Sequence, residues 1–290
     1  LLGNISINDF KFKPSDRETS FGTASDVKQF KVYFDGEEKD KFETYFGTVS
    51  LNYKRNRATT FSLLFSGFLT NEFVSYDISG EYWLDQAGTG GSDGIGGELG
   101  VGKYMEHSRN RLKASVLTGA LKGSTVAGRN HLSYGIVYAH ENFRDRTKEW
   151  EWRDSAGYSL PTKPDGVHLV YNLSSRQDIT TNRFAVFAED AIYFESSKAF
   201  ITLNAGLRMS YWDFNKEFLV SPRVNVSFTP VNHNNWNYRI AAGMYYQSPF
   251  YKEYREAVVD DLGNSYVVLN NNIKSPRSIH VVLGTDYTFR

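Results

Sequence analysis

Apolar and polar residues alternate along most of the chain, most clearly in its last third. In residues 200–212 one face would carry Leu203 and Leu207, and the other would carry Asn204 and Arg208. A period of two is that of a β-strand with two different faces. The 3.6-residue period of an amphipathic helix is almost absent, so the pattern predicts a nearly all-β fold.

The alternating stretches are long, running to about ten to thirteen residues, whereas strands of soluble proteins are mostly about five or six and membrane-spanning strands about nine to eleven. Aromatic residues stand near the ends of the apolar faces, as at Trp236 and Tyr246. Such rings lie at the bilayer interface in membrane barrels. The pattern favours an antiparallel transmembrane β-barrel over a soluble sandwich with aromatic-rich inner faces, whose strands are shorter.

The expected strands are distributed along the whole chain. They are residues 5–12, 29–34, 44–54, 58–69, 73–84, 98–106, 111–122, 131–142, 182–195, 199–212, 218–229, 236–248 and 277–290. About thirteen strands with no evident closing strand predict part of a larger barrel of the outer-membrane transporter type. Residues 1–290 would then belong to one transmembrane barrel domain.

The expected connections alternate in length. Short joins are expected at residues 55–57, 195–198 and 230–235. Long polar segments are expected at residues 13–27, 142–181 and 247–276. Bacterial barrels have short periplasmic turns and longer outer loops, so we place the short joins in the periplasm and the long segments outside. The Gly-rich residues 86–97 must then lie on the periplasmic side, although their length suits an outer loop.

Composition narrows the chemistry. The chain has 33 Lys and Arg, 33 Asp and Glu, six His and no Cys. Balanced charge argues against a nucleic-acid partner, and the absence of Cys removes thiolate metal sites and thiol nucleophiles. Apolar runs of the kind seen at Tyr134–Ala139 are too short for a helical membrane span.

Catalytic and metal-binding patterns are weak. The His residues show no HExxH spacing, and the nearest constellation, His140 and Glu141 followed by Asp145, is expected to be exposed on a loop edge. Asp260, Asp261 and Asn264 offer oxygen ligands for calcium, but their spacing follows no known loop and favours a solvated turn. We expect no catalysis, no metal and no cofactor.

Several motifs resemble those of a known family. They are Leu203-Asn204-Ala205-Gly206-Leu207-Arg208, Asp213-Phe214-Asn215, Ser221-Pro222-Arg223 and Gly243-Met244-Tyr245-Tyr246-Gln247-Ser248-Pro249. Their order and spacing resemble the barrel of TonB-dependent outer-membrane receptors, in which an "aGLR" strand precedes an "sPR" strand and a "G-x-Y-x-Q-x-P" strand. Further phrases resemble the Bacteroidetes branch of that family: Val32-Tyr33-Phe34-Asp35-Gly36, a turn at His107-Ser108-Arg109-Asn110, and Asp154-Ser155-Ala156-Gly157-Tyr158.

The resemblance implies a function. Members lie in the bacterial outer membrane, in contact with its lipid, bind a scarce nutrient in their outer loops, and import it when the TonB complex pulls on a plug domain. A surface lipoprotein is a further implied partner. This chain shows no plug-like region and no terminal aromatic residue, so we expect the plug and the closing strands in a longer parent protein. A passive porin is the alternative function, and a membrane-anchored hydrolase is the third.

Two sets of candidate site residues follow. Aromatic and charged residues of the long segments suit a polar ligand, or else pack the loops together: they are Trp150, Trp152, Arg153, Tyr158, Tyr251 and Arg255. The polar faces of the last strands make a cationic, hydrogen-bonding lumen, which the resemblance places against the plug, with direct substrate contact as the alternative. Its residues are Arg208, Arg223, Arg239, Asn204 and Asn225. The facing of residues 182–195 stays open, because Glu189 and Asp190 cannot both point inward.

Overall fold

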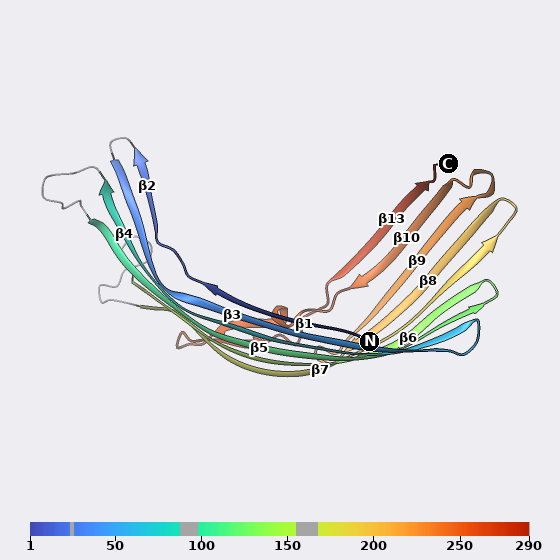
Figure 1. Cartoon of the computed structure of the whole chain (residues 1–290), viewed down its shortest axis with the longest axis horizontal. Helices are drawn as coiled ribbons and strands as arrows, with labels where there is room; N and C mark the ends of the chain where they lie inside the picture. The colour runs from blue at the N-terminus through green and yellow to red at the C-terminus, as the bar shows by residue number, and fades with distance from the viewer. Residues whose placement is uncertain (24–25, 88–97, 155–167, 290) are drawn as a thin grey trace.

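The computed structural model describes residues 1–23, 26–87, 98–154 and 168–289. In these residues the chain forms one curved β-sheet (Figure 1). Its hydrogen-bonded path runs in the order β1-β3-β4-β5-β6-β7-β8-β9-β10-β13, and every neighbouring pair on this path is antiparallel. The predicted all-β, antiparallel fold is confirmed, and in the described residues the sheet does not close on itself.

Ten strands make the main wall. They are β1 (Leu2–Phe12), β3 (Asp26–Lys54), β4 (Thr59–Ala87), β5 (Glu98–Ala127), β6 (Asn130–Asp154), β7 (His168–Glu195), β8 (Ala199–Trp212), β9 (Glu217–Pro230), β10 (Trp236–Tyr246) and β13 (Arg277–Tyr287). Three short strands complete the sheet: β2 (Arg17–Thr23) beside β3, and β11 (Arg255–Val259) paired with β12 (Ser265–Leu269). The 3-10 turns η1 (Val231–His233) and η2 (Tyr251–Tyr254) are the helical elements of the described residues, and neither is long enough to cross a membrane.

Strands β3 to β7 are much longer than the sequence predicts. Each has between 25 and 30 residues. The expected strands 29–34 and 44–54 are one strand, β3, and 58–69 and 73–84 are one strand, β4. Strands 98–106 and 111–122 likewise join in β5, so the turn expected at His107–Asn110 is wrong. The count of about thirteen agrees only because three short strands replace the three false divisions.

The physical reason for these errors is a change of residue type partway along the long strands. Near Asn71 and His107 the alternation gives way to charged and polar residues on both faces, which normally marks a turn. The ladder nevertheless continues without a break, because Asn71 pairs with Lys113 and Asp77 with His107. The strands have passed from an apolar surrounding into a polar one, and the chain has not reversed.

Four hairpin turns lie at one end of the sheet, where residues 55–58, 128–129, 196–198 and 231–235 connect neighbouring strands (Figure 1). Arg55 N donates to Thr59 O at 3.0 Å in the first, and Gly128 takes a φ of 61° in the second. The short joins predicted at 55–57, 195–198 and 230–235 are therefore confirmed as turns. β4 ends and β5 begins at the opposite end of the sheet, and most of the Gly-rich residues 86–97, from 88 to 97, lie outside the described residues.

The long segments also differ from expectation. Residues 142–154 and 168–181 belong to β6 and β7, so a loop over residues 142–181 is wrong, and only residues 155–167 fall outside the described strands. In the segment 13–27, β2 pairs with β3 and prolongs the edge that β1 begins. Residues 247–276, which we call the β10–β13 segment, contain η2, β11 and β12.

The register separates two faces of the sheet. We call the face covered by the β10–β13 segment the inner face and the opposite one the outer face. Directly paired residues share a face, and the pairs Leu51–Leu63, Leu63–Leu121, Leu121–Ile136 and Ile136–Val186 run across five strands of the outer face. All five of these side chains are exposed. In β3 the apolar outward positions run from Tyr45 to Tyr53, nine residues as a tilted membrane strand requires (about nine to eleven).

This assignment predicts different tolerance to charge at neighbouring positions. Val224 lies on the outer face midway along β9, and Asn225 lies on the inner face. Val224→Arg in the full-length protein is expected to cost about 2–4 kcal/mol of unfolding free energy in lipid, since it places a cation in hydrocarbon. Denaturant unfolding followed by tryptophan fluorescence measures the cost. Asn225→Arg is the matched control, and an equal loss in both variants would contradict the facing.

Candidate functional site

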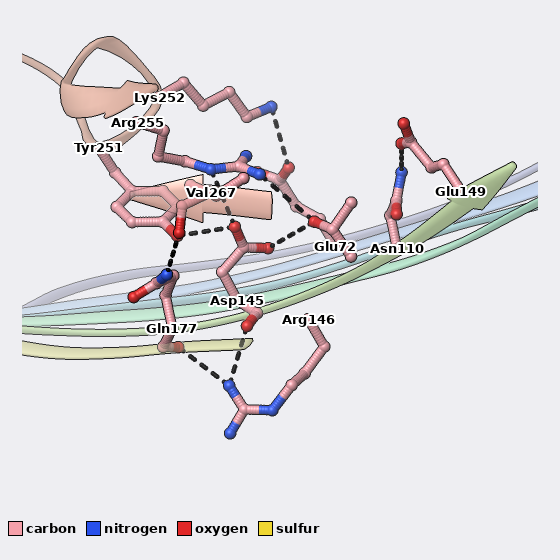
Figure 2. A network of polar contacts seen from close by, with 11 residues as sticks. Glu72, Asn110, Asp145, Arg146, Glu149, Gln177, Tyr251, Lys252, Arg255 and Val267 are labelled. Atoms are coloured by element: carbon pink, nitrogen blue, oxygen red, sulfur yellow. Dashed lines mark hydrogen bonds and ion pairs between the residues drawn. The ribbon is translucent and has the colours of Figure 1, made fainter. Parts of the chain in front are cut away.

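The β10–β13 segment is fixed to the inner face by a buried carboxylate. Tyr251 Oη donates to Asp145 Oδ2 at 2.7 Å, and Arg255 Nε lies 3.1 Å from the same oxygen. Arg255 Nη2 also donates to Thr147 Oγ1 at 3.3 Å. Figure 2 shows Tyr251, Arg255 and Asp145 meeting between the segment and the long strands, with Arg146 on the other side of the sheet.

An aromatic cluster lies beside this carboxylate. Tyr254 is fully buried and packs against Trp212 and Phe214, with ring centroids 5.5 and 4.7 Å apart. Tyr251 stacks on Phe143 at 5.1 Å. Because η2 places Tyr251 and Tyr254 on the sheet side, one turn of the segment supplies both aromatic anchors. This cluster is the main apolar core of the described residues.

Hydrogen bonds along the segment hold the rest of its length. Gln177 Nε2 donates to the backbone oxygen of Val267 at 2.7 Å. Ser275 Oγ donates to Glu217 Oε2 at 2.6 Å, and Lys252 Nζ approaches Glu72 Oε2 at 3.6 Å. The contacts come from β4, β6, β7 and β9, so the segment lies across much of the sheet rather than at its rim.

Local sequence explains the shape of the segment. The Glu253 carboxylate accepts the backbone N–H of Phe250 at 2.6 Å, which caps η2. Asp260 accepts the backbone N–H groups of Leu262 and Asn264 and closes the β11–β12 turn. The Asn264 hydrogen bond lowers the pKa of Asp260. Its carboxylate thus serves the turn, and the described residues contain no group of three or more side chains suited to a metal ion.

A polar cavity of about 260 Å³ lies where the segment meets the inner face. Arg255 and Lys252 line it from the segment, and Asp145 and Glu149 line it from β6. Asn110 donates a hydrogen bond to Glu149 across the same space. The cavity thus presents cations, carboxylates and an amide together, which suits a small polar ligand with several hydrogen-bonding groups.

The anchoring tyrosine has a raised pKa. Burial raises the pKa of Tyr251, and its hydrogen bond to Asp145 raises it further. The hydroxyl therefore stays protonated and keeps donating to Asp145 at physiological pH. Nearby, the hydroxyl of Tyr254 and the indole N–H of Trp212 are buried without a hydrogen-bond partner in the described part of the chain.

The predicted ligand-binding residues fall into separate places. Tyr251 and Arg255 meet at Asp145 on the inner face. Trp150 lies on the outer face, stacked on His107 at 4.9 Å, and Trp152 shares that face. Arg153 is paired with Glu151 on the inner face. Tyr158 lies outside the described residues. The sequence did not single out Asp145 as the meeting point.

The predicted lumenal residues share the inner face. Asn204 pairs directly with Asn225, and Arg223 pairs with Gly206 in the same register. Asn204, Arg223 and Asn225 line a hollow of about 430 Å³ together with Glu189. Arg223 forms an ion pair with Glu189. Glu189 therefore faces inward. Its neighbour Asp190 points to the outer face and accepts a hydrogen bond from Asn130.

Two further arginines complete this set. Arg239 forms an ion pair with Asp286 of β13 at 2.8 Å. Arg208 lies opposite Ser221 on the same face and has no ion pair with any described residue. Arg223 and Arg239 thus find carboxylates within the wall itself, and Arg208 does not.

The constellation His140, Glu141 and Asp145 is not assembled. His140 lies on the outer face and contacts Asn182 Oδ1 at 3.0 Å, whereas Glu141 faces inward and forms an ion pair with Arg183 at 2.9 Å. Asp145 is only 4% exposed, so the expectation of an exposed loop edge was wrong for it. The reason is that β6 continues through this region as a strand covered by the β10–β13 segment.

The fold and its two faces define the wall of a membrane-spanning β-barrel, with an apolar outer band and a polar inner face. Residues 2–290 match the family model described as TonB dependent receptor-like, beta-barrel. The chain belongs to this family of TonB-dependent receptors, a receptor and transporter family of the bacterial outer membrane.

Solved structures of transporters are similar to the chain. The copper transporter OprC shares 10% identity at a TM-score of 0.45, with 99% of this chain and 51% of that chain covered. The outer membrane transporter YddB from Escherichia coli shares 9% identity at a TM-score of 0.40, with 99% of this chain and 45% of that chain covered. The ferric enterobactin receptor PfeA of Pseudomonas aeruginosa, in complex with BCV-L6, shares 11% identity at a TM-score of 0.37, with 99% of this chain and 51% of that chain covered. The chain spans about half the length of these proteins. No match was found among the curated proteins.

The buried carboxylate gives a first test of the site. Asp145→Ala leaves Tyr251 and Arg255 without their common acceptor. Removing one partner of a fully buried ion pair costs about 3–5 kcal/mol. The free energy lost from docking of the segment should be smaller than this, because 21% of the Arg255 side chain is exposed. Hydrogen exchange of the amides of residues 251–269 should become faster. Asp286→Ala, which breaks the exposed pair with Arg239, should leave that exchange unchanged, and unchanged exchange in Asp145→Ala would contradict the anchoring role.

A second test concerns pH at the β8–β9 turn. Partial burial would raise the pKa of Asp213, but hydrogen bonds from Asn182 N at 2.8 Å, Thr181 Oγ1 at 2.6 Å and Asn182 Nδ2 at 2.7 Å outweigh it and lower that pKa. The folded pKa lies below the unfolded one, so the stabilisation is complete above about pH 4 and is lost as pH falls through the folded pKa. Asp213→Asn should be less stable near neutral pH and show a smaller loss on acidification, measured by denaturant midpoints from about pH 6 to 2.5. Parallel curves for the two proteins would contradict this role.

Proposed function

We propose that the chain is part of the barrel of an outer-membrane receptor that binds a scarce nutrient on its outer side and imports it by TonB-dependent, energy-coupled transport. Membership of the TonB-dependent receptor family supports this proposal. The plug domain on which the TonB complex pulls, and the strands that close the barrel, would come from the rest of the protein. In the described residues the free edges of β1 and β13 are where such strands would pair.

The observation that carries the proposal is the polar cavity under the β10–β13 segment. The segment occupies the inner face at the level where the outer face is already charged, beyond the apolar band. A nutrient passing through the barrel would therefore meet the segment before it reached the depth of the membrane. The proposed orientation places the short turns in the periplasm and this cavity toward the cell exterior.

The side chains of the cavity would recognise a polar ligand. Arg255 presents a planar guanidinium fork, which suits carboxylate or phosphate oxygens. Lys252 adds a second cation from the segment, and Asn110 and Glu149 offer hydrogen-bonding groups from the wall. Since Arg255 also contacts Asp145, a ligand that competes for its guanidinium would loosen the anchor of the segment. Ligand binding and movement of the segment would then be coupled.

Uptake by cells carrying the full-length protein tests the proposal. Labelled ferric chelates, cobalamin, oligosaccharides and peptides are supplied singly at limiting concentration to a deletion strain complemented with the wild-type protein. One class should be taken up, and its uptake should stop when the proton gradient is collapsed or the TonB protein is removed. Arg255→Ala should reduce that uptake by about tenfold, the scale of a lost contact worth about 1.4 kcal/mol.

Arg57→Ala is the matched control, because Arg57 is an exposed arginine in a turn at the other end of the sheet. It should leave uptake unchanged. Uptake that continues without energy coupling would replace the receptor with a passive porin. Hydrolysis of the supplied compound at the cell surface would favour a membrane-anchored hydrolase.

A further inference from the structure

The outer face changes character abruptly above its apolar band. Tyr45 pairs with Leu69, and the row that they begin continues through Ser115 to Asn142. The next row of residues on the outer face lies two residues further along each strand, a distance of about 7 Å. It contains Lys113 and Arg144, which pair directly across β5 and β6. Aromatic residues followed at once by cations mark the level where hydrocarbon gives way to lipid headgroups.

Cations dominate the outer face of β5, β6 and β7 at this level. We call them the basic belt, which consists of Arg111, Lys113, Arg144, Arg146, Lys148 and Arg176. All are exposed except Arg146, which is partly buried. Figure 2 shows Arg146 on the side of the sheet opposite Asp145, as the alternation requires.

The register sets like charges against one another in the belt. Arg111 pairs directly with Arg146, which pairs directly with Arg176, so three arginines stand side by side on three strands. Like charges directly opposite in a sheet are destabilising. Asp178, at 2.8 Å from Arg146, is the only described carboxylate in ion-pair contact with the belt. Arg144 and Arg176 have no ion pair with any described residue. The belt therefore carries an excess of positive charge that the described wall does not neutralise.

We propose that the basic belt binds the phosphate groups of glycolipids in the outer leaflet of the outer membrane. Guanidinium groups match phosphate oxygens with paired hydrogen bonds, and clusters of Lys and Arg beside a membrane bind anionic headgroups. The site lies directly beyond the apolar band, so a lipid whose acyl chains cover Leu121 and Ile136 would bring its headgroup to this level. The position and the charge together favour a lipid over a soluble anion or a protein partner.

The full-length protein in neutral detergent tests the belt. Native mass spectrometry is used to titrate it with a bisphosphorylated glucosamine lipid, with the dephosphorylated form of that lipid, and with inorganic phosphate. The wild-type protein should bind the phosphorylated lipid saturably, and the triple variant R111Q/R144Q/R176Q should bind it at least about tenfold more weakly. The triple variant with Lys at these positions should stay within about threefold of wild type, since the charge is kept.

The control variant R55Q/R57Q/R129Q removes three exposed arginines from the turns at the other end of the sheet and should bind as wild type does. Equal binding by the R111Q/R144Q/R176Q protein, or equal binding of the dephosphorylated lipid, overturns the proposal. Competition by inorganic phosphate at concentrations similar to those of the lipid would also overturn it, by showing a site for a free anion.

The unfolding temperature provides a second test, which does not require the triple variant to fold. The phosphorylated lipid should raise the unfolding temperature of the wild-type protein, and the dephosphorylated lipid should not. In lipid-free detergent Arg176→Gln should unfold at the same temperature as wild type or higher, because it relieves repulsion with Arg146. A clear drop in that variant, or equal shifts with both lipids, would refute the proposal.

Discussion

Every strand of this sheet must serve two surroundings at once, because side chains alternate between its faces while backbone groups must pair within the membrane. Hydrogen bonds between neighbouring strands pair the backbone N–H and C=O groups. The side chains alone therefore determine which face contacts lipid and which contacts water. Thus Leu121, Ile136 and Val186 form one continuous row across three strands without any intervening polar group. A shift of register by one residue would exchange that row with the polar inner face, so the faces fix the register.

The same constraint explains what could be predicted from the sequence. β8 was predicted with its observed bounds, and β9 differs by only one residue at each end, because there both faces keep a constant character along the whole strand. In β4 and β5 the outward residues change from apolar to polar or charged halfway along, at Asn71 and Lys113. Local patterns do not distinguish a strand that enters water from a chain that turns. The distinction is made by the neighbouring strand, whose pairing continues past the change.

The candidate site was only half accessible to prediction. Tyr251 and Arg255 stand out in the sequence as aromatic and charged residues of a long polar segment. Their common acceptor, Asp145, is 106 residues away from Tyr251 and carries no local signal. Once the ladder is known, Asp145 shares its face with Glu141 and with the residues that contact the segment. Long-range contact of this kind follows from topology, which no short motif encodes.

Comparison of the two faces shows how the same residue type acquires different roles. On the inner face Arg223 meets Glu189 of β7, across β8, and Arg239 meets Asp286 of the adjacent β13, so these charges contribute to the wall that holds them. On the outer face Arg111 and Arg176 flank another arginine, and the sheet gains nothing from placing them together. Charges neutralised within the wall are sufficient for the fold, whereas an excess of one sign requires counterions from outside the chain. The inner face is therefore largely complete as a structure, and the outer face above the apolar band is completed by its surroundings.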